Sequence, residues 1–171
     1  GFLPSIPRHF HGSSVSAEIQ KKVGVYLSKL QSQVGQAQDA VRDLFDGIDH
    51  FVEAQSEHGR ANAPYRLNIL LTSKRYQPDW SEIEIRADDL GSALLKVEQG
   101  LQGLHKGLTE LEDQGLLNYD NLLQEVYARL EHVRETREHM QTIVCQPRES
   151  ESVYWLSIGA KGKEVVLNSA P

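Results

Sequence analysis

Two stretches of sequence decide the fold. Residues 23–51 read VGVYLSKLQSQVGQAQDAVRDLFDGIDHF, and residues 83–111 read IEIRADDLGSALLKVEQGLQGLHKGLTEL. In both, apolar residues recur at alternating gaps of four and three, the spacing that forms one apolar seam along an α-helix. The seam positions are Val23, Leu27, Leu30, Val34, Ala37, Val41, Leu44, Ile48 and Phe51 in the first stretch and Ile83, Ala87, Leu90, Leu94, Val97, Leu101, Leu104, Leu108 and Leu111 in the second. We expect two paired helices, each about 42 Å long over its seam.

Proline and glycine positions set the expected helix bounds. The first helix is expected over residues 16–56 and the second from residue 78 to about 113, where Gly115 can end it. A third helix is expected over about 120–144, with a weaker seam because Arg137 occupies a core-type position. Two interpretations of Arg137 stay open: its stem packs while its head reaches water, or it forms a buried ion pair.

The C-terminal part has a different pattern. Residues 153–158 and 164–167 are rich in β-branched and aromatic side chains, and a glycine-bearing segment separates them, which predicts a β-hairpin. A lone hairpin is marginal in water, so residues 66–72 are expected to supply a third strand. The expected fold class is mainly α: an antiparallel bundle of three long helices with heptad-like seams plus a small β-hairpin or sheet.

Three regions follow from this pattern. Residues 1–13 are expected to be an N-terminal connector, 14–148 a helical domain, and 150–171 the hairpin region.

The glycines within the expected helices each cost about 1 kcal/mol relative to alanine. They indicate close helix–helix approach or simple tolerance of glycine, or else helices that can bend.

Composition excludes several classes of protein. The chain has 171 residues, of which 39% are hydrophobic and 25% charged, and its net charge is −6, so it is not a basic nucleic-acid binder as a whole. A single cysteine, Cys145, excludes an internal disulfide framework and a four-cysteine metal or iron–sulfur site. No stretch approaches 18 consecutive apolar residues, so no membrane association is expected.

No catalytic motif is recognisable. The sequence has no phosphate-binding loop of the GxxxxGK[ST] type, no GxGxxG, no GxSxG and no HExxH. His132 and His139 lie seven residues apart but lack the paired Glu-x-x-His motifs of a di-metal bundle, so we expect them to be exposed to solvent. We therefore expect no catalytic residue, metal or cofactor within this chain.

One segment does suggest a binding function. Residues 58–78 contain no Asp or Glu, and cations there alternate with aromatic side chains, a mixture that suits a single nucleic-acid strand. The alternative is a strand-bearing connector whose basic residues pair with acidic helix faces and whose aromatic residues pack. The candidate nucleic-acid-binding residues are Arg60, Arg66, Lys74, Arg75, Tyr76 and Trp80, with Lys161 and Lys163 joining them if the strands pair.

The C-terminal run also carries a family resemblance. Val153-Tyr154-Trp155-Leu156, a glycine-bearing turn and then residues 166–171 (VLNSAP) resemble the segment that re-enters the motor core of DinG-type superfamily 2 DNA helicases, relatives of XPD. In that family the segment follows a long, mostly helical insertion called the arch domain. The resemblance covers about 20 residues, and the preceding helices are similar to the arch in architecture only.

This resemblance implies a function. The chain would be the non-catalytic arch domain of a bacterial, cytoplasmic DinG-like helicase in DNA repair. It would belong to the branch without an iron–sulfur cluster, which includes proteins fused to a nuclease-type domain. Residues 150–171 would lead back to a motor domain outside this sequence, which would bind ATP and Mg²⁺. The implied partners are single-stranded DNA and the remainder of the helicase chain. A different class of function, a coiled-coil protein–protein interaction module, stays open beside it.

Overall fold

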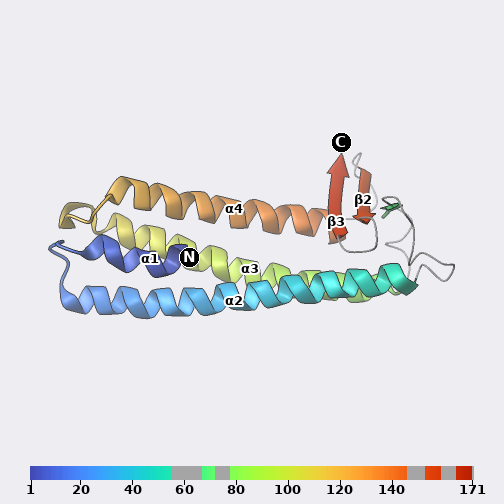
Figure 1. The fold of residues 1–171 in the computed structure, drawn as a ribbon, viewed down its shortest axis with the longest axis horizontal. Helices are drawn as coiled ribbons and strands as arrows, with labels where there is room; N and C mark the ends of the chain where they lie inside the picture. The colour runs from blue at the N-terminus through green and yellow to red at the C-terminus, as the bar shows by residue number, and fades with distance from the viewer. Residues whose placement is uncertain (55–66, 72–77, 146–152, 159–164, 171) are drawn as a thin grey trace. The chain divides into compact units, whose positions relative to one another are not determined.

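The three long helices predicted from the sequence are present. A computed structural model of the chain describes residues 1–54, 67–71, 78–145, 153–158 and 165–170. Its long helices are α2 (Ala17–Ala54), α3 (Trp80–Thr109) and α4 (Tyr119–Cys145), and successive helices run antiparallel (Figure 1). The predicted fold class, a mainly helical antiparallel bundle with a small sheet, is confirmed.

Local hydrogen bonds explain where these helices begin and end. The Ser16 hydroxyl accepts a hydrogen bond from the Ile19 amide at 3.4 Å, as expected of an N-cap. Helix α3 ends at Thr109, four residues before the predicted end, and a 3₁₀ turn, η3 (Glu112–Gln114), follows it. Gly115 then takes a left-handed conformation with φ of 69°, which a side chain would disfavour.

The predicted seams form the core. The structure describes every seam position of the two heptad stretches. Of these seam positions, Val41 is exposed, Val23, Val34 and Leu111 are half-buried, and the others are buried. In α4 the buried positions include Leu122, Val126, Leu130, Met140 and Val144. The neighbouring Leu123 is half-buried.

The chain forms two compact units. Unit 1 contains residues 1–38 and 92–137, and unit 2 contains residues 39–91 and 138–171. Each unit thus combines parts of all three long helices. This division cuts across the helices, so it differs from the predicted boundaries near residues 13 and 150 and does not test them.

The N-terminal residues 1–13 are an integral part of unit 1. They form the short helices α1 (Phe2–Ser5) and η1 (Ile6–Phe10), and both Ile6 and Phe10 are buried. The Leu117 amide donates to the His9 carbonyl at 2.8 Å, which ties the segment to the chain just before α4. The sequence predicted only an N-terminal connector here, and in the structure two of its side chains pack within unit 1.

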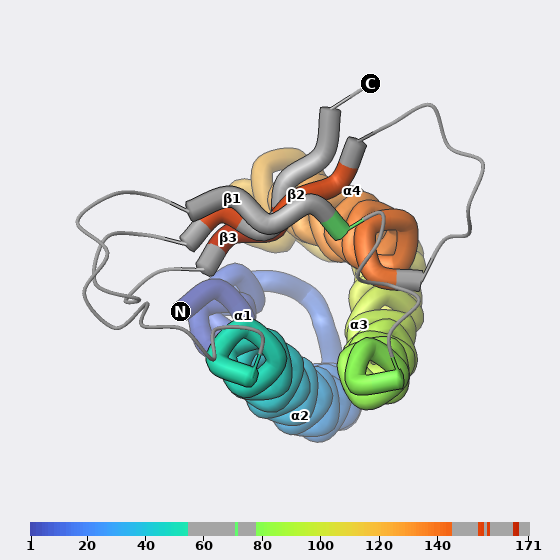
Figure 2. The backbone as a smooth tube through the Cα atoms, turned by 90° about the vertical axis from the view of Figure 1, so that its right-hand side faces the viewer, coloured from blue at the N-terminus to red at the C-terminus, as the bar shows by residue number. Residues whose placement is uncertain are grey.

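Unit 2 carries the sheet. Strands β1 (Leu67–Leu70), β2 (Val153–Ile158) and β3 (Val165–Ala170) lie side by side in the order β1–β2–β3, and both pairs are antiparallel (Figure 2). The predicted hairpin and its predicted third strand are confirmed. The Leu71 amide donates to the Tyr154 carbonyl at 3.0 Å, and both of these side chains are buried.

Candidate nucleic-acid interface

Most of the predicted DNA-binding residues lie outside the residues that the structure describes. These are Arg60, Arg66, Lys74, Arg75, Tyr76, Lys161 and Lys163. Their role in DNA binding therefore stays a prediction. The structure does describe the strands that precede or follow these segments in the sequence.

Trp80 is the exception, and its predicted role is wrong. Its side chain is completely buried at the start of α3. The indole lies edge-on to the Phe51 ring, with the ring centroids 5.2 Å apart, and its Nε1–H donates to the Val144 carbonyl at 3.3 Å. A base cannot stack on a ring with no exposed face, so Trp80 is a core residue that joins α2, α3 and α4 within unit 2.

The register of the sheet relates the basic segments to one another. Leu67 pairs with Ile158 at one end of the β1–β2 ladder, and Leu70 pairs with Trp155 at the other. Arg66 directly precedes Leu67, and the segment with Lys161 and Lys163 directly follows Ile158. These two parts of the sequence are thus connected to the same end of the sheet. The segment with Lys74, Arg75 and Tyr76 follows Leu71, at the opposite end.

An arginine also crosses between two helices of unit 2. Arg86 on α3 donates through Nη1 to the Asp43 carboxylate at 2.7 Å and to the Asp43 backbone carbonyl at 3.2 Å. A Cβ at Gly47 would lie 2.7 Å from Arg86 Cδ, so the absence of a side chain there makes room for the arginine stem. At this position the glycine accommodates a side chain from the neighbouring helix.

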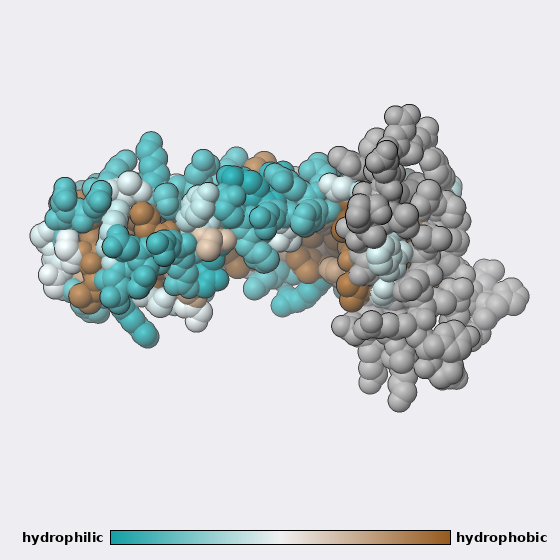
Figure 3. All heavy atoms as spheres, turned by 90° about the horizontal axis from the view of Figure 1, so that it is seen from above, coloured by the Kyte–Doolittle hydropathy of each residue, from teal (hydrophilic) through white to brown (hydrophobic). Residues whose placement is uncertain are grey.

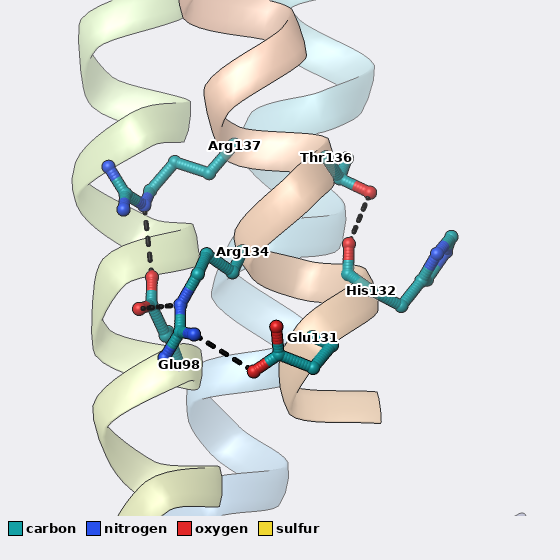
Figure 4. Close-up of polar contacts among 6 residues, drawn as sticks. All are labelled: Glu98, Glu131, His132, Arg134, Thr136 and Arg137. Atoms are coloured by element: carbon teal, nitrogen blue, oxygen red, sulfur yellow. Dashed lines mark hydrogen bonds and ion pairs between the residues drawn. The ribbon is translucent and has the colours of Figure 1, made fainter. Parts of the chain in front are cut away.

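Unit 1 contains a second charged cluster, centred on Glu98. The Glu98 carboxylate on α3 accepts from Arg134 Nε at 3.1 Å and from Arg137 Nε at 3.0 Å, both on α4, and Arg134 also pairs with Glu131 (Figure 4). The Glu98 side chain is 13% exposed and that of Arg137 is 23% exposed. The ion-pair interpretation of Arg137 is therefore the correct one, with partial rather than complete burial.

The pKa of the Glu98 carboxyl is lowered by its two arginine partners. Burial alone would raise it, but the hydrogen bonds and positive charges of Arg134 and Arg137 outweigh burial and lower it below its ordinary value. The sequence could have pointed to the cluster through the i, i+3 spacing of the two arginines. It could not identify Glu98 as their partner, because the pairing joins residues 36 and 39 positions apart.

The described part of the face shown in Figure 3 is mostly hydrophilic, with hydrophobic patches between the polar side chains. His132 and His139 are exposed, as predicted. Among the described residues, no three His, Cys, Asp or Glu side chains are grouped so that they could hold a metal ion. Within the same ranges, no helix has the length and apolarity required to cross a membrane.

The described residues thus define a helical bundle whose second unit bears a three-stranded antiparallel sheet. No protein-family model matches this chain. Curated proteins and solved structures likewise give no match.

Proposed function

We propose that this chain is a non-catalytic helical domain that contacts single-stranded DNA through the basic segments joined to its sheet. The observation that carries the proposal is the strand register. Leu67 opposite Ile158 connects Arg66 and the Lys161–Lys163 segment to one end of the sheet. Arg66 belongs to the acid-free segment 58–78, and cations of this kind neutralise the phosphates of a nucleic-acid strand.

The setting proposed for this activity is the arch domain of a cytoplasmic, bacterial DinG-like helicase of DNA repair. The residues of the resemblance fall on β2 and β3, the two strands that form the hairpin. In this proposal ATP and Mg²⁺ act in a motor domain outside this sequence, and the chain shapes the opening through which the strand passes. Its partners are single-stranded DNA and the remainder of the helicase chain.

Fluorescence anisotropy of a labelled single-stranded oligonucleotide tests the proposal. The variant Lys161→Ala with Lys163→Ala and the variant Lys74→Ala with Arg75→Ala should each weaken binding about tenfold at low salt, since each removes two phosphate-neutralising charges. The matched control is Lys21→Ala with Lys106→Ala, which removes two exposed charges from α2 and α3 in unit 1. Equal affinity of all three variants and the wild type would contradict the proposal.

The coiled-coil interaction module is the competing proposal. It requires apolar seams that another chain completes. The seams of α2 and α3 are already covered within this chain, with Val41 as their exposed position. This burial favours the domain proposed above, because it removes the surface that a coiled-coil partner would use.

A further inference from the structure

Unit 1 has a pocket between α2 and α3 that the sequence did not suggest. Its volume is about 170 Å³. The lining residues are Tyr26, Lys29, Leu30, Gln33, Lys96, Gln99 and Gly100. All of them belong to unit 1, so the pocket is separate from the sheet and its basic segments.

The shape of the pocket depends on Gly100. A Cβ at this position would lie 2.6 Å from Leu30 Cδ1 and 3.0 Å from Gln33 Oε1, so glycine lets α2 and α3 approach closely beside the pocket. The Tyr26 hydroxyl donates to the Gly100 carbonyl at 2.9 Å, which fixes the phenol against α3. Partial burial raises the pKa of Tyr26 above its ordinary value, and a phenol is neutral at physiological pH in either case.

The charge of the pocket has one sign. Lys29 and Lys96 are its charged lining residues, one from each helix, and neither forms an ion pair with any residue that the structure describes. Residues 19–38 of α2 contain no Asp or Glu. Residues 92–109 of α3 contain Glu98 as their one acid, and Arg134 and Arg137 hold it.

Apart from Glu98, these parts of the two helices contain no acidic residue, although the whole chain has a net charge of −6. Two ammonium groups around one pocket repel each other, and an anion between them would replace that repulsion with attraction. The amides of Gln33 and Gln99 add N–H donors to the same lining.

We infer that this pocket binds a phosphate group. Ammonium and amide donors are the groups that hold a phosphate oxygen, and no lining side chain carries a negative charge to oppose it. The volume is below the 300 Å³ or so of pockets that enclose drug-sized ligands, so it suits a single phosphate group better than a whole nucleotide. The phosphate is either inorganic phosphate or the terminal phosphate of a larger ligand.

An NMR titration of the complete chain tests this inference. Inorganic phosphate is added at constant ionic strength, with sodium chloride as the reference salt, and the amide resonances of Gly100 and Gln33 are followed. The expected result is a saturable shift at both amides that chloride does not produce. Shifts that are equal in the two salts, or that do not saturate, overturn the inference.

Variants assign the site. Lys29→Gln with Lys96→Gln should weaken phosphate binding about tenfold. Lys21→Gln with Lys106→Gln, which removes two exposed charges outside the lining, should leave it within about twofold. All four substitutions are at exposed positions, so the helical circular dichroism of both variants should match the wild type. If the two double variants bind phosphate equally, the pocket is not the site.

A second arm identifies the source of the phosphate. A short oligonucleotide with a 5′-phosphate is compared with the same oligonucleotide bearing a 5′-hydroxyl. Stronger binding of the phosphorylated form, lost in Lys29→Gln with Lys96→Gln, assigns the pocket to a terminal phosphate. Equal binding of the two forms beside saturable binding of inorganic phosphate assigns it to the free ion. The inference is independent of the basic segments joined to the sheet, because neither Lys161 nor Lys163 lines the pocket. Lys161→Ala with Lys163→Ala should therefore leave phosphate binding unchanged.

Discussion

At the scale of single residues, Trp80 shows that an aromatic side chain near lysines and arginines in the sequence need not be exposed for stacking with a nucleic-acid base. The sequence placed it beside cations, whereas the structure buries it against Phe51 and Val144. Trp80→Ala should lower the free energy of unfolding by about 3–5 kcal/mol, because it leaves a cavity and removes the edge-to-face contact. Chemical denaturation followed by circular dichroism measures the loss.

The control for Trp80 is Val25→Ala, because Val25 is 67% exposed and its truncation should change stability by less than about 0.5 kcal/mol. A Trp80→Ala variant as stable as Val25→Ala would contradict the burial of the indole.

Glu98 gives a prediction with a pH dependence. Its pKa is lower in the folded chain than the ordinary 4.5, so the ionised carboxylate stabilises the fold above about pH 4.5, and this contribution is lost as the pH falls through the folded-state pKa. Glu98→Gln should cost about 2 kcal/mol at pH 7, because Arg134 and Arg137 lose their charged acceptor. Denaturation at several pH values should show the difference shrinking below pH 4.5.

Glu125→Gln is the matched control for Glu98. The Glu125 carboxylate also accepts from an arginine, Arg129, at 2.6 Å, but the pair is about half exposed and should contribute less than 1 kcal/mol. Equal losses in the two variants, or a Glu98→Gln loss that grows at low pH, would show that the cluster does not stabilise the bundle.

At the scale of elements, the glycines of α3 divide by what surrounds them. A Cβ at Gly100 would meet the buried Leu30 side chain, whereas a Cβ at Gly107 would meet nothing within 4 Å. Gly107→Ala should therefore stabilise the chain by up to about 1 kcal/mol through helix propensity. Gly100→Ala gains the same propensity but overpacks the α2–α3 contact, so it should be about 1–3 kcal/mol less stable than Gly107→Ala.

Thermal or chemical denaturation of the two glycine variants measures this difference. If Gly100→Ala is as stable as Gly107→Ala, the two helices do not approach as closely as the structure has them.

The sequence predicted the elements better than it predicted their partners. Heptad spacing gave the three long helices and most of their buried positions, and β-branched runs gave all three strands, because these patterns are local. The packing of residues 1–13 and the Glu98 cluster could not be predicted, since both depend on contacts between distant parts of the chain. The candidate site was predicted from composition alone, which cannot distinguish an exposed aromatic residue from Trp80 in the core.

At the scale of the whole molecule, burial of both seams predicts a monomer. The apolar positions that a coiled-coil partner would need are covered within one chain, with the exception of Val41, which is 38% exposed. Light scattering over a range of concentrations should give the mass of a single chain, 19.2 kDa. A stable dimer that dissociates in Val41→Glu would instead support the interaction module.

The central claim is that the chain contacts single-stranded DNA through the basic segments joined to one sheet. The salt dependence of binding tests it most directly, because each phosphate neutralised on a single strand contributes about 0.7 to the slope of log K against log salt concentration. Lys161→Ala with Lys163→Ala should reduce that slope by about 1.4, while Lys21→Ala with Lys106→Ala leaves it unchanged. A slope that is the same in the wild type and in both variants would contradict the claim.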